Sequence, residues 1–237
     1  MLKCPGVDQS LIAFPEEHLC PNCKSKIEIW SDEKLGKCNK CNEIIRKSSI
    51  ADSVIEYAKE LGVSDAKHIE ISAISVEEKL AEICKNDKCP GYGLAPSCPP
   101  HVMNLNKFRS ILSEYHSSVI FKFDIPTNVL FGNERHEVLH LLHETASSIK
   151  EFAINNGYSN AMAIAAGSCK QIFCKKYNDC PVINDGGQCR YPQKSCPSMS
   201  GLGINFNKIT KLLNWDKENT DNQEPTSNMA GIVLLKI

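Results

Sequence analysis

The cysteines constrain this chain more than any other feature, because they fall into three groups with short spacings. The chain has 237 residues, of which 13 are cysteine. Thiols at such spacings in a reducing compartment are typical of metal ligands rather than of disulfides. The groups are Cys20, Cys23, Cys38 and Cys41, then Cys84, Cys89 and Cys98, then Cys169, Cys174, Cys180, Cys189 and Cys196, while Cys4 stands apart. We therefore predict a metalloprotein.

The rest of the composition argues against several other classes of protein. The N-terminus shows no apolar core followed by a small-residue cleavage site, so we expect a cytoplasmic protein. The longest apolar runs fall well short of the roughly 18 residues that cross a bilayer, so no membrane contact is expected. The net charge of -1 offers no basic excess of the kind that binds phosphates, and we expect no nucleic acid.

The first cysteine group has the C-x2-C…C-x2-C pattern of a zinc ribbon, formed by Cys20 and Cys23 and then by Cys38 and Cys41. Two residues between cysteines allow a tight turn that points both sulfurs at one ion. The segment Lys26–Trp30 alternates in hydrophobicity and is predicted to be one strand of a hairpin that brings the second pair opposite the first. Four thiolates leave no coordination position for a substrate, so we predict a structural zinc, with rubredoxin-like iron as the alternative.

Hydrophobic periodicity after the ribbon predicts strands that alternate with helices. Predicted helices cover 49–61, 76–83, 108–115, 134–156 and 206–215, and predicted strands cover 68–74, 118–124, 160–166 and 230–237. This order favours an α/β sandwich with one sheet of about four strands, from whose ends the cysteine-rich loops extend. We predict two domains, a zinc-ribbon-like module over 1–48 and a cysteine-rich α/β metal-binding domain over 49–237. The polar run 217–228 is predicted to be a solvated loop.

The third cysteine group supplies five thiols, and one 4Fe-4S cluster needs four. The loop carries more basic than acidic side chains, which suits an anionic cluster. These are Lys170, Lys175, Lys176, Arg190 and Lys194 against Asp179 and Asp185. Cys169, Cys174, Cys180 and Cys189 are the first choice of ligands, with Cys196 as the fifth candidate, and which four bind stays open.

The second cysteine group, Cys84, Cys89 and Cys98, supplies only three thiols. Three thiolates on a 4Fe-4S cluster leave one iron open, unless a fourth ligand comes from His101, Cys4 or Cys196. A zinc ion with three cysteines and one histidine is the competing interpretation. Proline follows six of the cysteines, as it follows the last cysteine of the bacterial ferredoxin motif, and this favours iron and sulfide. The six are Cys4, Cys20, Cys89, Cys98, Cys180 and Cys196.

Three histidines, His136, His140 and His143, share one face of the predicted helix 134–156. The segment lacks the H-E-x-x-H pattern of metalloproteases. We therefore interpret the stripe as a polar helix face rather than as a metal site.

Several separated motifs now point to one family. They are Cys84-x4-Cys89-Pro-x-Tyr-Gly-x4-Cys98-Pro-Pro, Gly167-Ser168-Cys169, and Cys189-Arg190-Tyr191-Pro192 with Pro197-Ser198-Met199 and Gly203-Ile204. With these motifs the chain resembles the DUF2284 family of predicted metal-binding proteins over roughly 65–237. The resemblance implies a cysteine-rich domain that carries iron–sulfur in anaerobic prokaryotes, and it implies no established reaction. Residues 1–47 lie outside it and look like a separate ribbon.

Three functional hypotheses follow. The first is a cytosolic iron–sulfur protein with one or two 4Fe-4S clusters, which passes electrons to a redox or metalloenzyme protein partner and uses the zinc ribbon for docking or stability. The second is an enzyme whose three-thiol cluster binds a substrate at its open iron. The third is a non-redox zinc-binding scaffold or metal-handling protein. No catalytic residue is assigned, and whether the protein is an enzyme is left open.

Overall fold

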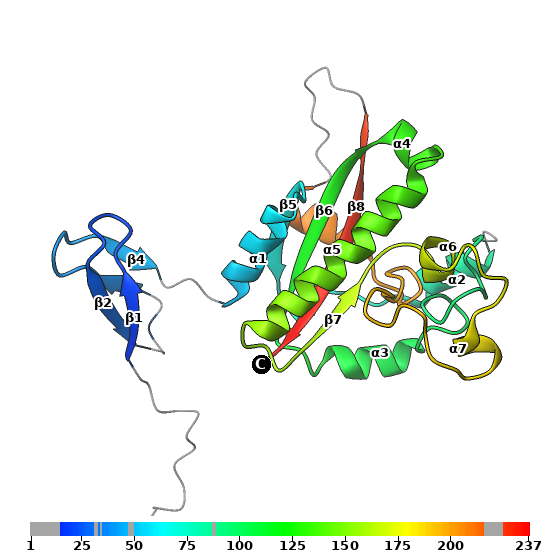
Figure 1. Cartoon of the computed structure of the whole chain (residues 1–237), viewed down its shortest axis with the longest axis horizontal. Helices are drawn as coiled ribbons and strands as arrows, with labels where there is room; N and C mark the ends of the chain where they lie inside the picture. Colours follow the sequence, from blue (N-terminus) through cyan, green and yellow to red (C-terminus); the bar gives the residue numbers. More distant parts are fainter. Residues whose placement is uncertain (1–14, 31–32, 34, 47–49, 87–88, 216–224) are drawn as a thin grey trace, which may run out of the picture. The chain divides into compact units, whose positions relative to one another are not determined.

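A computed structural model of the chain describes residues 15–30, 33, 35–46, 50–86, 89–215 and 225–237 (Figure 1). The chain divides into two compact units, Met1–Ser49 and Ile50–Ile237. The predicted domain boundary at 48/49 lies outside the described residues, as do Cys4 and most of the predicted loop 217–228. None of the described helices has the length and apolar character needed to span a bilayer.

The smaller unit consists of two antiparallel hairpins. The strands are β1 (Pro15–Leu19) with β2 (Lys26–Trp30), and β3 (Leu35–Lys37) with β4 (Ile44–Arg46). The predicted strand Lys26–Trp30 is present, and its alternation buries Ile27 and Ile29. Gly36 lets β3 approach this surface, because a Cβ there would lie only 2.5 Å from Ile29 Cγ1.

The larger unit is an α/β domain with one four-stranded sheet, as the sequence predicted. Its strands are β5 (Asp65–Ile69), β6 (Ser117–Pro126), β7 (Asn160–Ile164) and β8 (Thr226–Lys236). Its helices are α1 (Ile50–Glu60), η2 (Ile71–Ala73), α2 (Glu78–Asn86), α3 (Leu105–Leu112), α4 (Thr127–Phe131), α5 (Arg135–Asn155), α6 (Cys169–Phe173), α7 (Pro181–Asn184) and α8 (Phe206–Leu213). The strand order is β5-β6-β8-β7, and every neighbouring pair is antiparallel.

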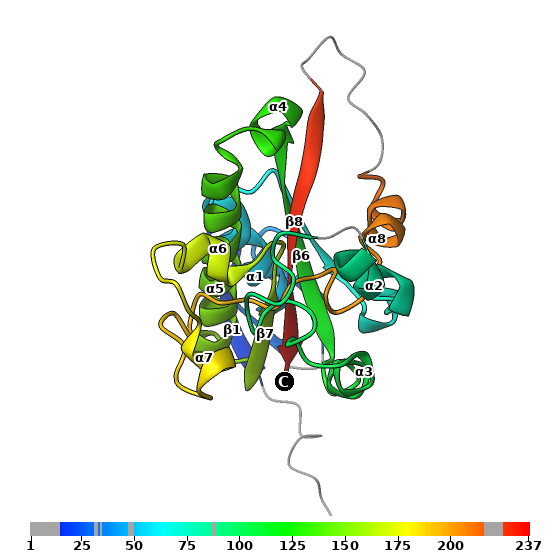
Figure 2. The ribbon, with the colours of Figure 1, turned by 90° about the vertical axis from the view of Figure 1, so that its right-hand side faces the viewer.

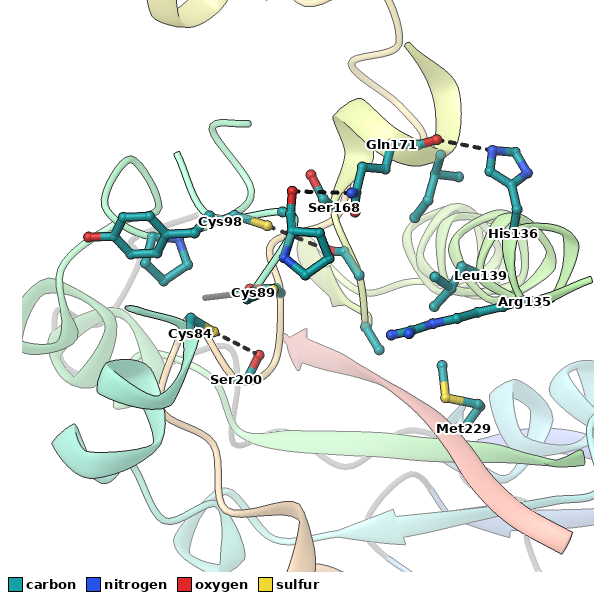
Figure 3. Close-up of a pocket in the computed structure, with 18 of the residues that line it drawn as sticks. Cys84, Cys89, Cys98, Arg135, His136, Leu139, Ser168, Gln171, Ser200 and Met229 are labelled. Carbon is teal, nitrogen blue, oxygen red and sulfur yellow. Dashed lines mark hydrogen bonds between the residues drawn. The ribbon is translucent and has the colours of Figure 1, made fainter. Parts of the chain in front are cut away.

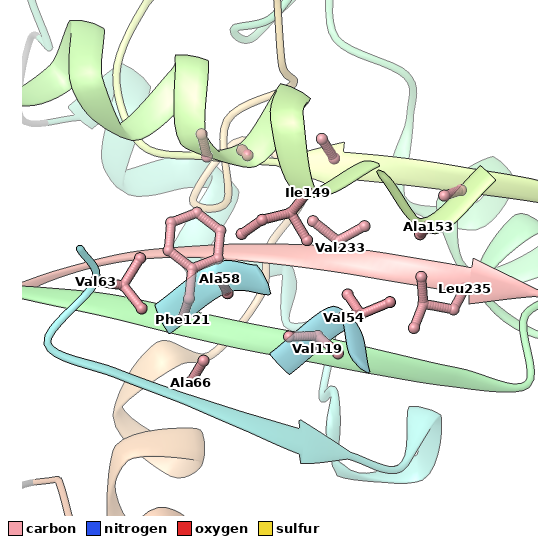
Figure 4. Packing of buried hydrophobic residues seen from close by; sticks show 14 of the residues in the cluster. Val54, Ala58, Val63, Ala66, Val119, Phe121, Ile149, Ala153, Val233 and Leu235 are labelled. Atoms are coloured by element: carbon pink, nitrogen blue, oxygen red, sulfur yellow. The ribbon is translucent and has the colours of Figure 1, made fainter. Parts of the chain in front are cut away.

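Helices cover both faces of this sheet, as Figure 2 shows with α1 and α5 on one side and α3 and α8 on the other. The alternation of β8 explains the two layers, because successive side chains of a strand point to opposite faces. Val233 and Leu235 pack with α1 and α5 (Figure 4), whereas Ile232 and Leu234 pack with α3 and α8. The sheet is therefore buried on both faces, and β8 contributes to two separate apolar cores.

Gly231 in β8 makes room for the ring of Phe121 on the neighbouring strand β6. A Cβ at this position would lie 2.5 Å from Phe121 Cζ and 3.2 Å from the carbonyl oxygen of Ile164. We expect Gly231→Ala to lower the free energy of unfolding by about 1 to 3 kcal/mol, the usual cost of overpacking a core, measured by urea denaturation. In a Phe121→Leu background the same change should cost less, and an equal cost would contradict this explanation.

The predicted element boundaries differ from the structure at two instructive places. The strand predicted over 68–74 is β5, which begins at Asp65 and ends at Ile69, and a 3-10 turn then carries Ile74 into the core shared with α3 and α8. Helix α3 begins three residues earlier than predicted, because the Asn104 side chain caps it by accepting a hydrogen bond from Lys107 N at 2.8 Å. The short helices α4, α6 and α7 were not predicted.

Candidate metal centres

The two cysteine pairs of the ribbon lie in turns with the same backbone geometry. The carbonyl of Cys20 accepts a hydrogen bond from Lys24 N at 2.9 Å, and the carbonyl of Cys38 accepts one from Asn42 N at 2.9 Å. Lys24 and Asn42 adopt the left-handed conformation, with φ of 58° and 61°. Each turn follows directly on a strand, so each hairpin presents its two thiols from one end.

The four ribbon thiols converge as the spacing predicted. Their Sγ atoms all lie within 4.8 Å of one another, and Cys20–Cys41 and Cys23–Cys38 are each 3.5 Å apart. Tetrahedral zinc with Zn–S bonds of about 2.3 Å requires sulfurs about 3.8 Å apart, so the set fits a zinc-ribbon-like module. Among the described residues, this is the one group of three or more potential ligands that lie so close together.

Ser25 supports two of these thiols from outside the tetrahedron. Its Oγ lies 3.0 Å from Cys23 Sγ and 3.2 Å from Cys38 Sγ. A hydroxyl that donates to a thiolate favours the charged form, and this contact is the main reason that the pKa of Cys38 is lowered to about 6. Ser25 therefore helps to present Cys38 as the thiolate that a metal requires.

Replacement of Ser25 by alanine is expected to weaken zinc binding by about 10- to 100-fold, because groups that hydrogen-bond metal ligands have effects of this size. Competition with a chromophoric chelator measures the affinity. Ser159→Ala, which removes an exposed hydroxyl in the other unit, serves as the matched control. Equal zinc affinity in the two variants would show that Ser25 plays no part in the site.

The second cysteine group lines a cavity of about 540 Å³ (Figure 3). Cys84 comes from α2, and its thiol donates to Ser200 Oγ at 3.6 Å. Cys98 is 5% exposed, and its thiol donates to Gly167 O at 3.8 Å. Cys89 is exposed at the edge of the same cavity. The structure thus brings the three thiols to one space, although not as close together as the ribbon thiols.

The wall of this cavity joins loops that are far apart in the sequence. Ser97 is the junction, because its carbonyl accepts from Ser198 N at 2.8 Å and its Oγ accepts from Cys169 N at 3.2 Å. Gly91 allows a further close approach, since a Cβ there would lie 2.8 Å from Ser168 Cβ. The second cysteine group therefore lies directly against the start of the third.

The Cys174 thiol lies near two other thiols of the third group. Burial is the main reason that the pKa of Cys174 is raised, and the nearby thiols of Cys169 and Cys189 add to it, while Arg190 opposes the shift. The Sγ of Cys189 accepts a hydrogen bond from Tyr191 N at 3.4 Å. Backbone donors and a cation beside cysteine sulfurs are features that stabilise thiolate-bound clusters.

Cys180 lies at the start of α7. Hydrogen bonds of the residue before it connect this segment to the segment that contains Cys189. The preceding residue, Asp179, accepts two hydrogen bonds from Arg190, each at 3.1 Å, through its carbonyl and its carboxylate. This link connects the segment containing Cys180 to the segment containing Cys189.

Cys196 has a different environment from the other four. It is 3% exposed and belongs to the apolar core formed by α1, α5 and the sheet. Burial raises the pKa of its thiol to about 11, so the neutral thiol predominates near neutrality. Of the other candidates for a fourth ligand at the cavity, His101 is exposed and does not line it.

Two histidines of α5 contact the backbone of the segments that carry or flank the third cysteine group. His136 Nε2 lies 3.0 Å from Gln171 O in α6. His143 is fully buried, and both ring nitrogens have backbone partners. Its Nδ1 lies 3.2 Å from Lys194 O and 3.4 Å from Cys196 N, and its Nε2 lies 3.0 Å from Ala166 O. Burial lowers the pKa of His143, which keeps the ring neutral. The prediction of a polar helix face is therefore wrong for this residue, because its ring is enclosed between α5 and the loop.

Sequence reasoning did not single out Arg135 or Gln171, although both line the cavity. Arg135 comes from the first turn of α5 and Gln171 from the unpredicted α6. No spacing signal links either of them to the cysteines, so only the tertiary structure identifies them.

Comparison with known proteins gives one result for this chain. A family model described as "Predicted metal-binding protein (DUF2284)" matches residues 67–235. Comparisons with curated proteins and with solved structures found no match. The matched range contains the second and third cysteine groups and begins after the ribbon.

Proposed function

From the premise that this chain belongs to the DUF2284 family of predicted metal-binding proteins, we propose that its larger unit binds iron–sulfur clusters and transfers electrons. Metal binding itself is supported by the family and by the four converging ribbon thiols. The proposal concerns which metal the larger unit holds and what that metal does.

The convergence of Cys84, Cys89 and Cys98 on one cavity carries this proposal. A cluster of four irons is larger than a single ion, so its ligands stand farther apart than the ribbon thiols do. Three thiols around an open space suit such a group better than they suit zinc, which needs four donors at short distance. In this proposal, the three thiols bind one 4Fe-4S cluster, and one iron faces the cavity.

A second 4Fe-4S cluster is assigned to Cys169, Cys174, Cys180 and Cys189. In this proposal Cys196 is left out, because its thiol is buried in the apolar core. Bound clusters supply one-electron transfer. The chain contributes the hydrogen bond from Tyr191 N to Cys189 and the positive charge of Arg190, both of which stabilise the reduced, more negative state.

The proposed setting is the cytoplasm, where thiols stay reduced, and the proposed partner is a redox or metalloenzyme protein. In this proposal the closed ribbon site stabilises its module and offers a docking surface for that partner. No role in catalysis follows for the ribbon, because four thiolates occupy every position on zinc.

A second candidate function is favoured by the composition of the cavity. Besides the three cysteines, it is lined by Arg135, His136 and Ser168, and polar groups that converge in a concave site are typical of binding pockets. An enzyme would bind its substrate there, at the open iron of the three-thiol cluster.

Anaerobic purification with analysis of iron, sulfide and zinc tests the proposal. We expect about eight irons, about eight sulfides and about one zinc per chain, and a brown colour that dithionite bleaches. A colourless protein with zinc at every cysteine group would reject the proposal in favour of a zinc-binding scaffold.

A further inference from the structure

We propose that the cavity lined by Cys84, Cys89 and Cys98 is a binding site for a small organic carboxylate, held by Arg135 and Ser168. This inference rests on the proposed function, because the three-thiol cluster forms one wall of the same cavity. It adds the chemical class of the ligand. The volume of about 540 Å³ lies within the range of about 300 to 1,000 Å³ that is usual for small-molecule sites.

Arg135 supplies the positive charge. In Figure 3 its side chain extends from α5 into the cavity, above Met229. Within the part of the chain that the structure describes, its guanidinium makes no hydrogen bond and no ion pair, whereas Arg109 and Arg190 each have carboxylate and carbonyl partners. A guanidinium offers five donors in a planar fork that matches a carboxylate in a bidentate arrangement.

Ser168 supplies a buried hydroxyl to the cavity. The residue is 2% exposed, lines the cavity, and lies beside the Cys98 thiol (Figure 3). It occupies the N-cap position of α6, yet its side chain makes no capping hydrogen bond. Its Oγ meets no partner in hydrogen-bond geometry among the described residues, although it lies close enough to the Cys98 sulfur to favour the thiolate form of that residue. Burial of an unpaired hydroxyl is unfavourable, so this group is placed to bond a ligand.

Two other polar side chains of the lining, those of Gln171 and His136, are already engaged. Gln171 donates through its side-chain Nε2 to Pro90 O at 3.2 Å, and His136 Nε2 lies 3.0 Å from the backbone oxygen of Gln171. Among the described lining residues there is neither an aspartate nor a glutamate. Apart from the thiolates that would hold the proposed cluster, Arg135 is thus the one fixed charge among the described lining residues, and its guanidinium can pair with one carboxylate.

The apolar part of the lining indicates the rest of the ligand. Leu139 and Ile172 lie on the side of α5 and α6, and Met229 of β8 lies below Arg135 in Figure 3. The hydrocarbon part of such a ligand would pack against these apolar side chains, and its carboxylate would bind Arg135. Inorganic phosphate lacks a hydrocarbon part and carries more charge than one arginine balances.

Calorimetric titration of the anaerobically purified holoprotein with butyrate tests this proposal, with butyramide and inorganic phosphate as comparison ligands. We expect butyrate to bind, and butyramide and phosphate to bind at least about tenfold more weakly.

Arg135→Gln should weaken butyrate binding by about 10- to 100-fold, the usual effect of losing hydrogen bonds between charged groups. Arg135→Lys keeps the charge but not the fork, and should fall between wild type and Arg135→Gln. Lys107→Gln, on the exposed surface of α3, removes the same charge and should leave binding unchanged.

Ser168→Ala separates a ligand-binding role from a structural one. The alanine keeps the Cβ that contacts Gly91, and the lost hydroxyl meets no partner in hydrogen-bond geometry in the described part of the chain. We expect butyrate binding to weaken by about threefold or more while the melting temperature stays the same or rises. A fall in melting temperature with unchanged binding would assign the hydroxyl to stability and overturn its part in the proposal.

Iron analysis of each sample keeps the two proposals apart. Full iron content without butyrate binding, or with equal binding to Arg135→Gln, overturns the carboxylate site and leaves the iron–sulfur function standing. Phosphate that binds more tightly than butyrate also overturns it. Absence of iron from the purified wild-type chain overturns the proposed function and the carboxylate site together.

Discussion

A Cys98→Ser variant purified without oxygen is expected to retain about half of the iron of the wild-type chain, that is, about four of about eight atoms. Cys98 is the most deeply placed thiol of the cavity, and it lies between Ser97 and Gly167. Serine is a poor ligand for iron–sulfur clusters, and two remaining thiols hold such a cluster weakly. The cluster assigned to the third cysteine group has its own four thiols and should remain. Iron and sulfide analysis, together with the visible spectrum, measures the loss.

Cys196→Ala is the matched control for this experiment. It also removes a buried cysteine sulfur, but from the apolar core rather than from the cavity. We expect full iron content together with a modest loss of stability from the small void that remains. If Cys196→Ala lost iron and Cys98→Ser kept it, the assignment of both thiols would be wrong. Loss of all iron from Cys98→Ser would instead indicate one cluster shared by the second and third groups.

The second large effect is expected from removal of zinc. A strong chelator should unfold the ribbon over 15–46 and leave the larger unit folded. The apolar cluster of the ribbon contains only Cys20, Ile27, Ile29, Cys38 and Ile45 as buried members. So small a core does not support a fold by itself, and structural zinc typically contributes about 10 to 16 kcal/mol in modules of this kind.

Two-dimensional NMR of the amide groups measures this effect directly. Signals from the ribbon should collapse to the range of unfolded chains on chelation and return on addition of zinc. Cys38→Ser should behave like the chelated protein, whereas the surface variant Glu17→Gln, which breaks an exposed ion pair, should stay folded. A ribbon that keeps its dispersed signals without metal would contradict a structural role for zinc.

The success of the helix and strand predictions has a local cause. The continuous apolar run of β8 reflects burial on both faces of the sheet, and the helical spacing in α1 and α5 reflects burial on one face of each helix. Such patterns can be read from neighbouring residues. The element boundaries depended on single interactions, such as the Asn104 cap of α3 and the bond from Trp215 Nε1 to Asp65 Oδ2 near the start of β5. Hydrophobic patterns do not report these interactions, so the predicted limits were shifted by a few residues.

The cysteine sites also differ in whether local sequence or tertiary structure defines them. The amino-acid sequence by itself determined the ribbon site, because both ligands of each pair fall within one turn and a zinc ion needs only two such turns. Only the tertiary structure decided that Ser97 joins the second and third groups, that Cys196 lies in the apolar core, and that Arg135 and Ser168 meet at one cavity. These contacts connect distant residues, such as Ser97 and Cys169, which are 72 positions apart, and they exist only after the sheet has brought its loops together.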